Sequence, residues 1–198
     1  MVVQVLADEG TGVVFGYSGG AILPTYDAIF RFNQQHAANN GGKEPLPLIV
    51  PANEQGAGFM ASGYARASGK VGVALVTSGP GATNTVTPVR DCMADSIPIV
   101  VICGQVGTAA IGTDAFQEAP VSNIMAACAK HVFLVTDPLK LEATLRTAFE
   151  IARTGRPGPE GTSRSSSATA AARSCPPTTR SSATTRKMRP PAARNRCR

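Results

Sequence analysis

The stretch from Asn53 to Asn84 constrains the fold of this chain most strongly. It places one acidic residue, Glu54, at a predicted helix start, then an apolar run over 71–76, then the turn Gly79-Pro80-Gly81. The run is too short for a typical helix and carries no polar side chain, which is typical of a strand buried on both faces. A strand, a glycine-rich turn and a helix start present free backbone N–H groups, so we expect a cofactor-binding α/β unit.

Apolar runs and helical periodicity alternate along the chain. This alternation predicts a doubly wound, mainly parallel sheet with helices on both faces. In such sheets ligands bind beyond the carboxyl ends of the strands, an edge that here carries the Gly19-Gly20, Asn53-Glu54, Ser78–Gly81 and Gly104-Gln105 loops. The predicted strands cover 13–15, 46–50, 71–76, 97–103 and 131–135, and the predicted helices cover 2–8, 21–32, 53–68, the turn after 81 to about 90, 121–128 and 139–153.

The composition of the chain changes at residue 160. Residues 160–198 contain no Val, Ile, Leu, Phe, Tyr or Trp, and they carry nine Lys and Arg against one acid. The net charge of +6 therefore divides into +8 for this segment and −2 for residues 1–159. So few apolar side chains cannot offset the loss of chain entropy, and we predict a folded domain over 1–159 followed by a disordered tail over 160–198.

Composition also argues against several classes of protein. No stretch approaches the roughly 18–20 apolar residues that span a bilayer, and the first residues lack a signal-peptide pattern, so we expect a cytoplasmic protein without a membrane partner. The five cysteines form no C-x-x-C pair, and we expect no metal site in this chain. The basic tail lacks the aromatic side chains that stack on bases, so we expect no nucleic-acid partner.

The residues alone leave two alternatives open at the Asn53–Asn84 stretch. Glu54 can be a first-turn acid that favours the helix dipole and does nothing more. The run from Gly79 to Asn84 resembles a dinucleotide-binding fingerprint whose third glycine is replaced, so a Rossmann-like nucleotide-binding module remains an alternative. This reasoning ends at an α/β domain of the cofactor-binding kind.

Eight segments of the chain extend this interpretation by resemblance. They occur in the order seen in acetolactate synthase large subunits, and the chain resembles the N-terminal pyrimidine-binding domain of these thiamine diphosphate enzymes over about residues 1–159. The segments are FGYSGGA at 15–21, EQGA at 54–57, ASGYAR at 61–66, TSGPGATN at 77–84, DSIP at 95–98, GQV at 104–106, GTDAFQE at 112–118 and GRPGP at 155–159.

The resemblance implies a specific role for Glu54. In the family this acid hydrogen-bonds N1′ of the cofactor's aminopyrimidine ring, and a proton held there favours the imino form that deprotonates the thiazolium carbon. The implied reaction condenses two pyruvates, or pyruvate and 2-oxobutyrate, to 2-acetohydroxy acids with loss of CO2. It is the first common step of branched-chain amino acid biosynthesis; another thiamine diphosphate-dependent decarboxylase or carboligase is an alternative.

The resemblance also assigns six further residues, two cofactors and a subunit arrangement. FAD has a structural role in the family, Mg2+ is bound by a domain absent from these 198 residues, and the enzyme is a homodimer or homotetramer with a regulatory small subunit. The six residues are Gly20 and Gln117 at the reacting centre, Phe116 and Lys130 along the substrate channel, and Ser96 and Arg156 at FAD.

The chain departs from the family after residue 159. There the family continues with an apolar strand, a middle domain and a C-terminal domain that holds the diphosphate, whereas this chain continues with Arg, Ser, Thr, Ala and Pro. A shifted reading frame in a GC-rich gene would produce such a change, and a truncated, frameshifted fragment is our hypothesis. We therefore expect that the sheet lacks one strand and that the chain supplies only half of a cofactor site. We also expect little or no activity of the isolated chain.

Overall fold

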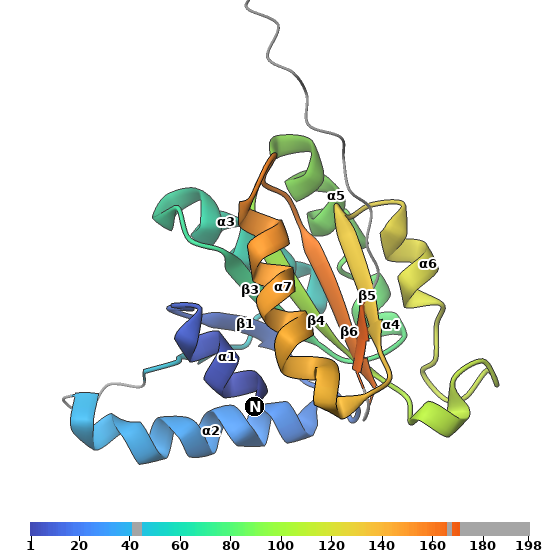
Figure 1. The fold of residues 1–198 in the computed structure, drawn as a ribbon, viewed down its shortest axis with the longest axis horizontal. Helices are drawn as coiled ribbons and strands as arrows, with labels where there is room; N and C mark the ends of the chain where they lie inside the picture. Colours follow the sequence, from blue (N-terminus) through green and yellow to red (C-terminus); the bar gives the residue numbers. More distant parts are fainter. Residues whose placement is uncertain (41–44, 166–167, 171–198) are drawn as a thin grey trace, which may run out of the picture.

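A seven-stranded sheet lies at the centre of the computed structural model, which describes residues 1–40, 45–165 and 168–170 (Figure 1). Six described strands run parallel in the order β2-β1-β3-β4-β6-β5, and β7 pairs antiparallel with β6. The strands are β1 Val14–Tyr17, β2 Leu48–Ile49, β3 Gly72–Val76, β4 Ile99–Gln105, β5 His131–Val135, β6 Glu160–Ser165 and β7 Ala168–Ala170.

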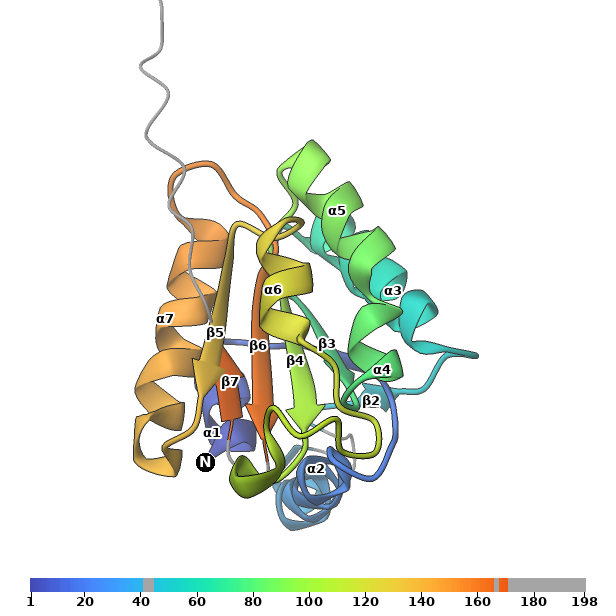
Figure 2. The same cartoon turned by 90° about the vertical axis from the view of Figure 1, so that its right-hand side faces the viewer.

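Helices cover both faces of the sheet, which confirms the predicted doubly wound α/β class (Figures 1 and 2). One face carries α1 Val2–Asp8, α2 Leu23–Ala37 and α7 Leu141–Arg153, and the other carries α3 Glu54–Ser68, α4 Pro80–Thr83, α5 Val86–Asp95 and α6 Val121–Ala126. Short 3-10 helices span Ala38–Asn40, Thr108–Ala110 and Pro138–Lys140. No helix in the described ranges is long and apolar enough to cross a membrane.

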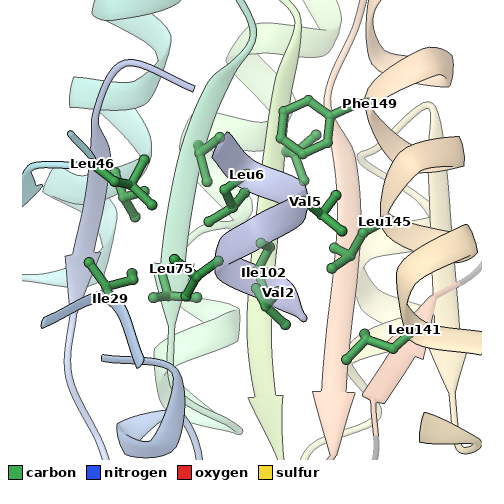
Figure 3. Close-up of a cluster of buried hydrophobic side chains, with 14 of the residues drawn as sticks. Val2, Val5, Leu6, Ile29, Leu46, Leu75, Ile102, Leu141, Leu145 and Phe149 are labelled. Atoms are coloured by element: carbon green, nitrogen blue, oxygen red, sulfur yellow. The ribbon is translucent and has the colours of Figure 1, made fainter. Parts of the chain in front are cut away.

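The core is divided by the sheet into two apolar clusters. Every residue of β3 and of β4 is buried, as the apolar runs over 71–76 and 97–103 predict, and β4 continues two residues further to the buried Gln105. Alternate side chains of these strands point to opposite faces, so Leu75 and Ile102 meet Leu6, Leu145 and Phe149 of α1 and α7 (Figure 3). Burial of each such side chain stabilises the fold by about 1.5–3 kcal/mol, so the sheet is anchored at its centre.

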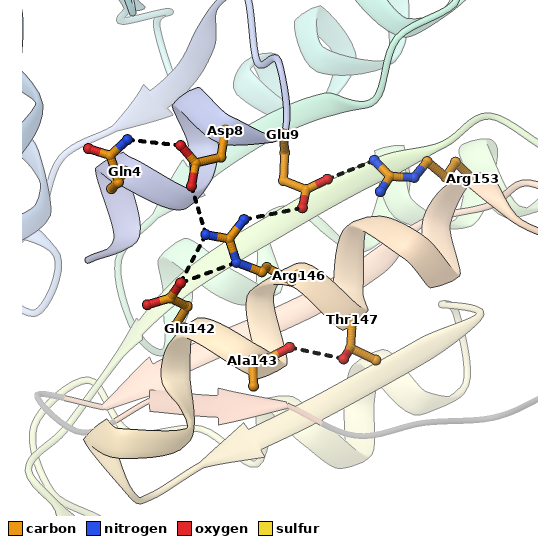
Figure 4. Close-up of polar contacts among 8 residues, drawn as sticks. All are labelled: Gln4, Asp8, Glu9, Glu142, Ala143, Arg146, Thr147 and Arg153. Atoms are coloured by element: carbon orange, nitrogen blue, oxygen red, sulfur yellow. Dashed lines mark hydrogen bonds and ion pairs between the residues drawn. The ribbon is translucent and has the colours of Figure 1, made fainter.

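Helix α1 is tied to α7 by a network of charged side chains (Figure 4). The Arg146 guanidinium contacts Asp8 at 2.7 Å, Glu142 at 2.9 Å and Glu9 at 3.8 Å, and Arg153 contacts Glu9 at 2.7 Å. Because most of these side chains are exposed, the network orients the two helices more than it stabilises them.

Helix α2 extends beyond its predicted end. The helix was predicted over 21–32 with a surface connection from Asn33 onward, but it continues to Ala37. The reason is a tertiary contact: the buried Asn33 side chain donates to the Leu46 carbonyl at 2.9 Å and accepts from the Leu46 N–H at 3.0 Å. The polar residue that suggested a loop therefore joins the helix to the segment before β2.

The sheet does not lack a strand after residue 159, and this expectation was wrong. Glu160–Ser165 forms β6 between β4 and β5, with Glu160 opposite Val100 on one side and His131 on the other. Strand ladders use backbone groups, so a polar segment can fill the position, although burial of the Glu160 side chain is costly. The division into 1–159 and 160–198 remains a prediction, and residues 166–167 and 171–198 of the predicted tail lie outside the described residues.

Candidate functional site

The sheet order places a topological switch point, where folds of this class form a crevice, at one end of β1 and β3. From β1 the chain crosses to β2 on one side and then to β3 on the other, so helices after these strands lie on opposite faces. Ligands bind at such a switch point, beyond the carboxyl ends of the strands. This carboxyl edge is the lower edge of the sheet in Figure 2, where β4 also ends. The order differs from the 3-2-1-4-5-6 order of dinucleotide-binding folds.

Glu54 is held at this edge as the first residue of α3. The side chain of Asn53 caps the helix by accepting from the Gly56 N–H at 2.7 Å, and Gly69 ends the helix in a left-handed conformation with φ of 71°, both as predicted. Glu54 is only 9% exposed. A buried carboxyl group is thus fixed where the helix N–H groups favour negative charge.

Asn84 holds one oxygen of the Glu54 carboxyl group. Its side-chain amide donates to Oε2 at 2.9 Å, although the two residues are 30 positions apart in the chain. Asn84 follows α4 and therefore arrives from the glycine turn after β3. This contact brings the two ends of the Asn53–Asn84 stretch together.

Two glycine-containing loops close around Thr77 beside this carboxyl group. A Cβ atom on Gly81 would lie 2.6 Å from Thr77 Cγ2 and 3.3 Å from Glu54 Oε1, and one on Gly19 would lie 2.5 Å from Thr77 Cβ. Only glycine fits these approaches without a shift of the chain. The Thr77 hydroxyl is buried and has no hydrogen-bond partner within the part of the chain that the structure describes, so a polar atom is left at the crevice.

Tyr26 contributes a second polar group near Glu54. Its hydroxyl donates to the Leu75 carbonyl at 3.0 Å, directly over Gly16. Burial, and then the negative charge of Glu54, raise the pKa of Tyr26 well above its usual value. Tyr26 therefore stays neutral and keeps its hydrogen bond over the whole physiological pH range.

Gln117 and Gly20 lie at the same edge as Glu54. Gln117 has a φ of 59°, and its carbonyl packs against Gly79, where a side chain would clash. A Cβ on Gly20 would meet nothing within 4 Å, so this loop borders open space. Phe116 is 89% exposed and projects from the loop before Gln117. The structure thus brings together Glu54, Gln117 and the glycine turns.

Lys130 lies at the opposite, amino edge of the sheet. It precedes β5, and its ammonium group donates to the carbonyl of Ile151 and, at 2.7 Å, to that of Thr154. These carbonyls belong to the last turn of α7, where a positive charge is favourable. In this domain Lys130 caps α7, and its assignment to a substrate channel stays a prediction.

Ser96 and Arg156 also lie at the amino edge and contact each other. Arg156 donates to the Ser96 hydroxyl at 2.8 Å and to the carbonyls of Met93 and Ala94 at 2.8 and 2.9 Å. Ser96 ends α5 in a left-handed conformation with φ of 61°. The structure thus brings the two side chains into contact, and their assignment to FAD stays a prediction.

Sequence reasoning missed three residues of the crevice. Asn84 stands in the TSGPGATN segment but received no role, because its partner is identified only by the fold. Tyr26 and Thr77 carried no local signal beyond their positions next to glycine-containing loops. Asn84 reaches Glu54 across 30 residues and Tyr26 lies near it from α2, and no spacing rule along the chain relates these positions.

The Glu54 carboxyl group supplies an acid–base group at this edge. It can exchange a proton through Oε1, because Asn84 already occupies Oε2. Oε1 lies beside Gly81, and the Thr77 hydroxyl lacks a partner within the described residues.

Comparison with known proteins agrees with this chemistry. The family model described as "Thiamine pyrophosphate enzyme, N-terminal TPP binding domain" matches residues 1–127; thiamine pyrophosphate is thiamine diphosphate. The chain is 54% identical over 156 residues to the mitochondrial acetolactate synthase catalytic subunit of Saccharomyces cerevisiae, covering 79% of this chain and 21% of the relative.

Bacterial relatives give the same result. The acetolactate synthase isozyme 2 large subunit of Escherichia coli is 49% identical over 158 residues, covering 80% of this chain and 27% of the relative. The large subunit of Lactococcus lactis is 46% identical over 159 residues, covering 80% and 26%. The chain thus spans about a fifth to a quarter of the length of these relatives. It belongs to the family of thiamine pyrophosphate enzymes, of which it contains the N-terminal TPP binding domain.

Proposed function

We propose that this chain provides the aminopyrimidine-binding half of the cofactor site in an acetolactate synthase. The reaction would condense two pyruvates, or pyruvate and 2-oxobutyrate, to a 2-acetohydroxy acid with release of CO2. The observation that carries the proposal is the buried Glu54 carboxyl group, held by Asn84 at the N-terminus of α3 beside Gly81. The relatives, all named acetolactate synthases, support the proposed reaction.

The proposed roles follow from the chemistry of each side chain. Glu54 holds a proton at the ring nitrogen through Oε1, and the glycines at 79 and 81 let the turn pack closely against Gln117 and Thr77 beside this carboxyl group. Gly20 and Gln117 border the same open space, where the oxoacids would react. When bound, thiamine diphosphate supplies the nucleophilic carbon and the electron sink for decarboxylation. The domain orients it and excludes water from Glu54.

Several finer proposals extend beyond this domain. FAD would contact Ser96 and Arg156, Phe116 and Lys130 would line a substrate channel, and Mg2+ would bind with the diphosphate to another segment. A homodimer or homotetramer with a regulatory small subunit would complete the enzyme; the relatives named large subunits support such a partner. Because the matched segment makes up only 21% and 27% of two of these relatives, we propose that residues 1–198 alone form little acetolactate.

The proposal is tested with Glu54→Gln, which keeps the shape of the side chain but cannot carry the proton in the same way. The aminopyrimidine half of the cofactor, 4-amino-2,5-dimethylpyrimidine, is titrated into residues 1–198 at millimolar concentration and followed by NMR. We expect shifts around Glu54 and Gly81 in the wild type and at least about tenfold weaker binding in the variant. Equal binding by both proteins would refute the role of Glu54.

A second experiment tests the reaction. A relative from which the segment matching residues 1–159 has been deleted is mixed with residues 1–198, thiamine diphosphate, FAD and Mg2+, and acetolactate is measured. Wild-type chain should restore activity and Glu54→Gln should not. Micromolar binding of thiamine diphosphate to residues 1–198 alone, measured by calorimetry, would contradict the half-site proposal.

A further inference from the structure

Asn84 is an exposed residue whose side chain nevertheless has one defined partner. Its amide donates to Glu54 Oε2 at 2.9 Å, at the carboxyl group on which the proposed function rests. We propose that Asn84 is a positioning residue for Glu54, and that its amide makes Oε1 the oxygen that faces a bound aminopyrimidine ring. This inference rests on the proposed function and adds a residue that sets the geometry of the proton-holding group.

The backbone that carries Asn84 is fixed independently of Glu54. The Asn84 N–H donates to the Pro80 carbonyl at 3.0 Å, and the following Thr85 donates to the Ala82 carbonyl through its N–H at 3.0 Å and its hydroxyl at 2.6 Å. Thr85 is fully buried. The amide of Asn84 therefore projects from a rigid turn, which is what a positioning residue needs.

The backbone of Glu54 is fixed as well, whereas its carboxyl group has rotational freedom of its own. The Asn53 cap and the Ala57 N–H, which donates to the Asn53 carbonyl at 3.1 Å, hold the first turn of α3. A glutamate side chain still has three rotatable bonds between the backbone and its oxygens. Within the described residues, the Asn84 amide donates the side-chain hydrogen bond that restrains this carboxyl group.

The direction of this hydrogen bond makes the two carboxyl oxygens different. An amide N–H can only donate, so Oε2 must accept and a proton carried by the carboxyl group resides on Oε1. Oε1 is also the oxygen beside Gly81, where a Cβ would stand 3.3 Å away. Asn84 and Gly81 therefore act together: the amide of Asn84 selects the oxygen, and the absence of a Cβ at Gly81 lets the turn approach Oε1 without crowding it.

The experiment measures the order of the Glu54 side chain in residues 1–198 by 13C relaxation of selectively labelled glutamate. Asn84→Ala should lower the order parameter of the Glu54 side chain and weaken binding of 4-amino-2,5-dimethylpyrimidine about tenfold. Asn84→Leu, which has a similar size but no donor, should do the same and guards against a folding defect in one variant. Thr83→Ala is the matched control, since Thr83 donates to Pro80 in the same turn at 3.2 Å.

Each outcome decides the proposal. Unchanged Glu54 order and unchanged aminopyrimidine binding in both Asn84 variants would overturn it, and so would an equal effect of Thr83→Ala, because the turn as a whole would then be responsible. If the wild type does not bind the aminopyrimidine at all, the proposed function fails. The Glu54 order parameter still decides whether Asn84 positions the carboxyl group.

Discussion

Replacement of Glu160 by valine tests how β6 fits into the sheet. Glu160 is fully buried between Val100 of β4 and His131 of β5, and neither of its carboxyl oxygens has a hydrogen-bond partner in the described part of the chain. Burial raises the pKa of Glu160 to about 9, although the positive charge of Lys130 opposes this. At pH 7 the folded protein therefore holds a proton that the unfolded chain releases.

The size of the effect follows from this difference in pKa. The pKa of Glu160 is higher in the folded protein than its unfolded value of 4.5. Its contribution to the free energy of unfolding is therefore complete below pH 4.5 and is lost as the pH rises to 9. Between pH 4.5 and 7 the loss is about 3 kcal/mol. Valine has no such proton and suits a buried strand, so Glu160→Val should raise the free energy of unfolding at pH 7 by at least about 3 kcal/mol.

His131 shapes the pH profile in the opposite sense. Burial, and then the charge of Lys130, lower the pKa of His131 to about 4 from an ordinary value of 6.5. The contribution of neutral His131 to the free energy of unfolding is therefore present above pH 6.5 and is lost as the pH falls toward 4. The slopes from His131 and Glu160 oppose each other between pH 4.5 and 6.5. Wild-type stability should be nearly level there and fall above pH 6.5, whereas Glu160→Val should gain stability up to pH 6.5 and then stay level.

Urea denaturation followed by circular dichroism at pH 5, 6, 7 and 8 measures these profiles. Glu160→Gln is the control, because it removes the titration but leaves a buried polar group without partners; its profile should match that of the valine variant at lower stability. The reasoning is refuted if wild-type stability does not fall between pH 6.5 and 8, or if wild type and Glu160→Val have parallel profiles.

Two further substitutions test packing and polar contacts. Gly161 lines an apolar cavity of about 10 Å3, and a Cβ there would meet Val132 side-chain atoms at 3.5–4.0 Å. Gly161→Ala should therefore raise the free energy of unfolding, measured by urea denaturation, by about 1 kcal/mol. Gly155→Ala is the control and should lower it, because Gly155 has a φ of 59°. Asn33→Ala removes the side-chain partner of both backbone groups of the buried Leu46 and should lower the free energy of unfolding by about 2–4 kcal/mol. The neighbouring exposed Gln34→Ala is the control and should cause no measurable change. A small effect of Asn33→Ala would contradict the role given to its two hydrogen bonds.

Several features of the fold could be predicted because they depend on neighbouring residues. The cap at Asn53 and the left-handed stop at Gly69 follow from local backbone chemistry, and α3 has the bounds that these two residues set. The buried strands β3 and β4 follow from apolar runs without polar side chains. The role proposed for Glu54 as the acid of the site came from eight segments in order, which no single local signal provides.

Other features could not be predicted because they depend on pairings between distant segments. The polar residues of Glu160–Ser165 form a central strand, since strand neighbours are chosen by backbone hydrogen bonds and chain topology, which side-chain patterns do not report. The same topology separates Lys130, Ser96 and Arg156 from Glu54 by placing them at opposite edges of the sheet.

The sequence by itself determined that this chain forms an alternating α/β domain with an acid at a helix start and a glycine turn after a buried strand. The folded arrangement adds that Asn84 holds Oε2 of that acid, that Gly81 approaches Oε1 without a Cβ and that the Thr77 hydroxyl is left without a partner in the described residues. The physical reason is that hydrogen bonds and close contacts act through space, across 30 residues in the case of Asn84 and Glu54.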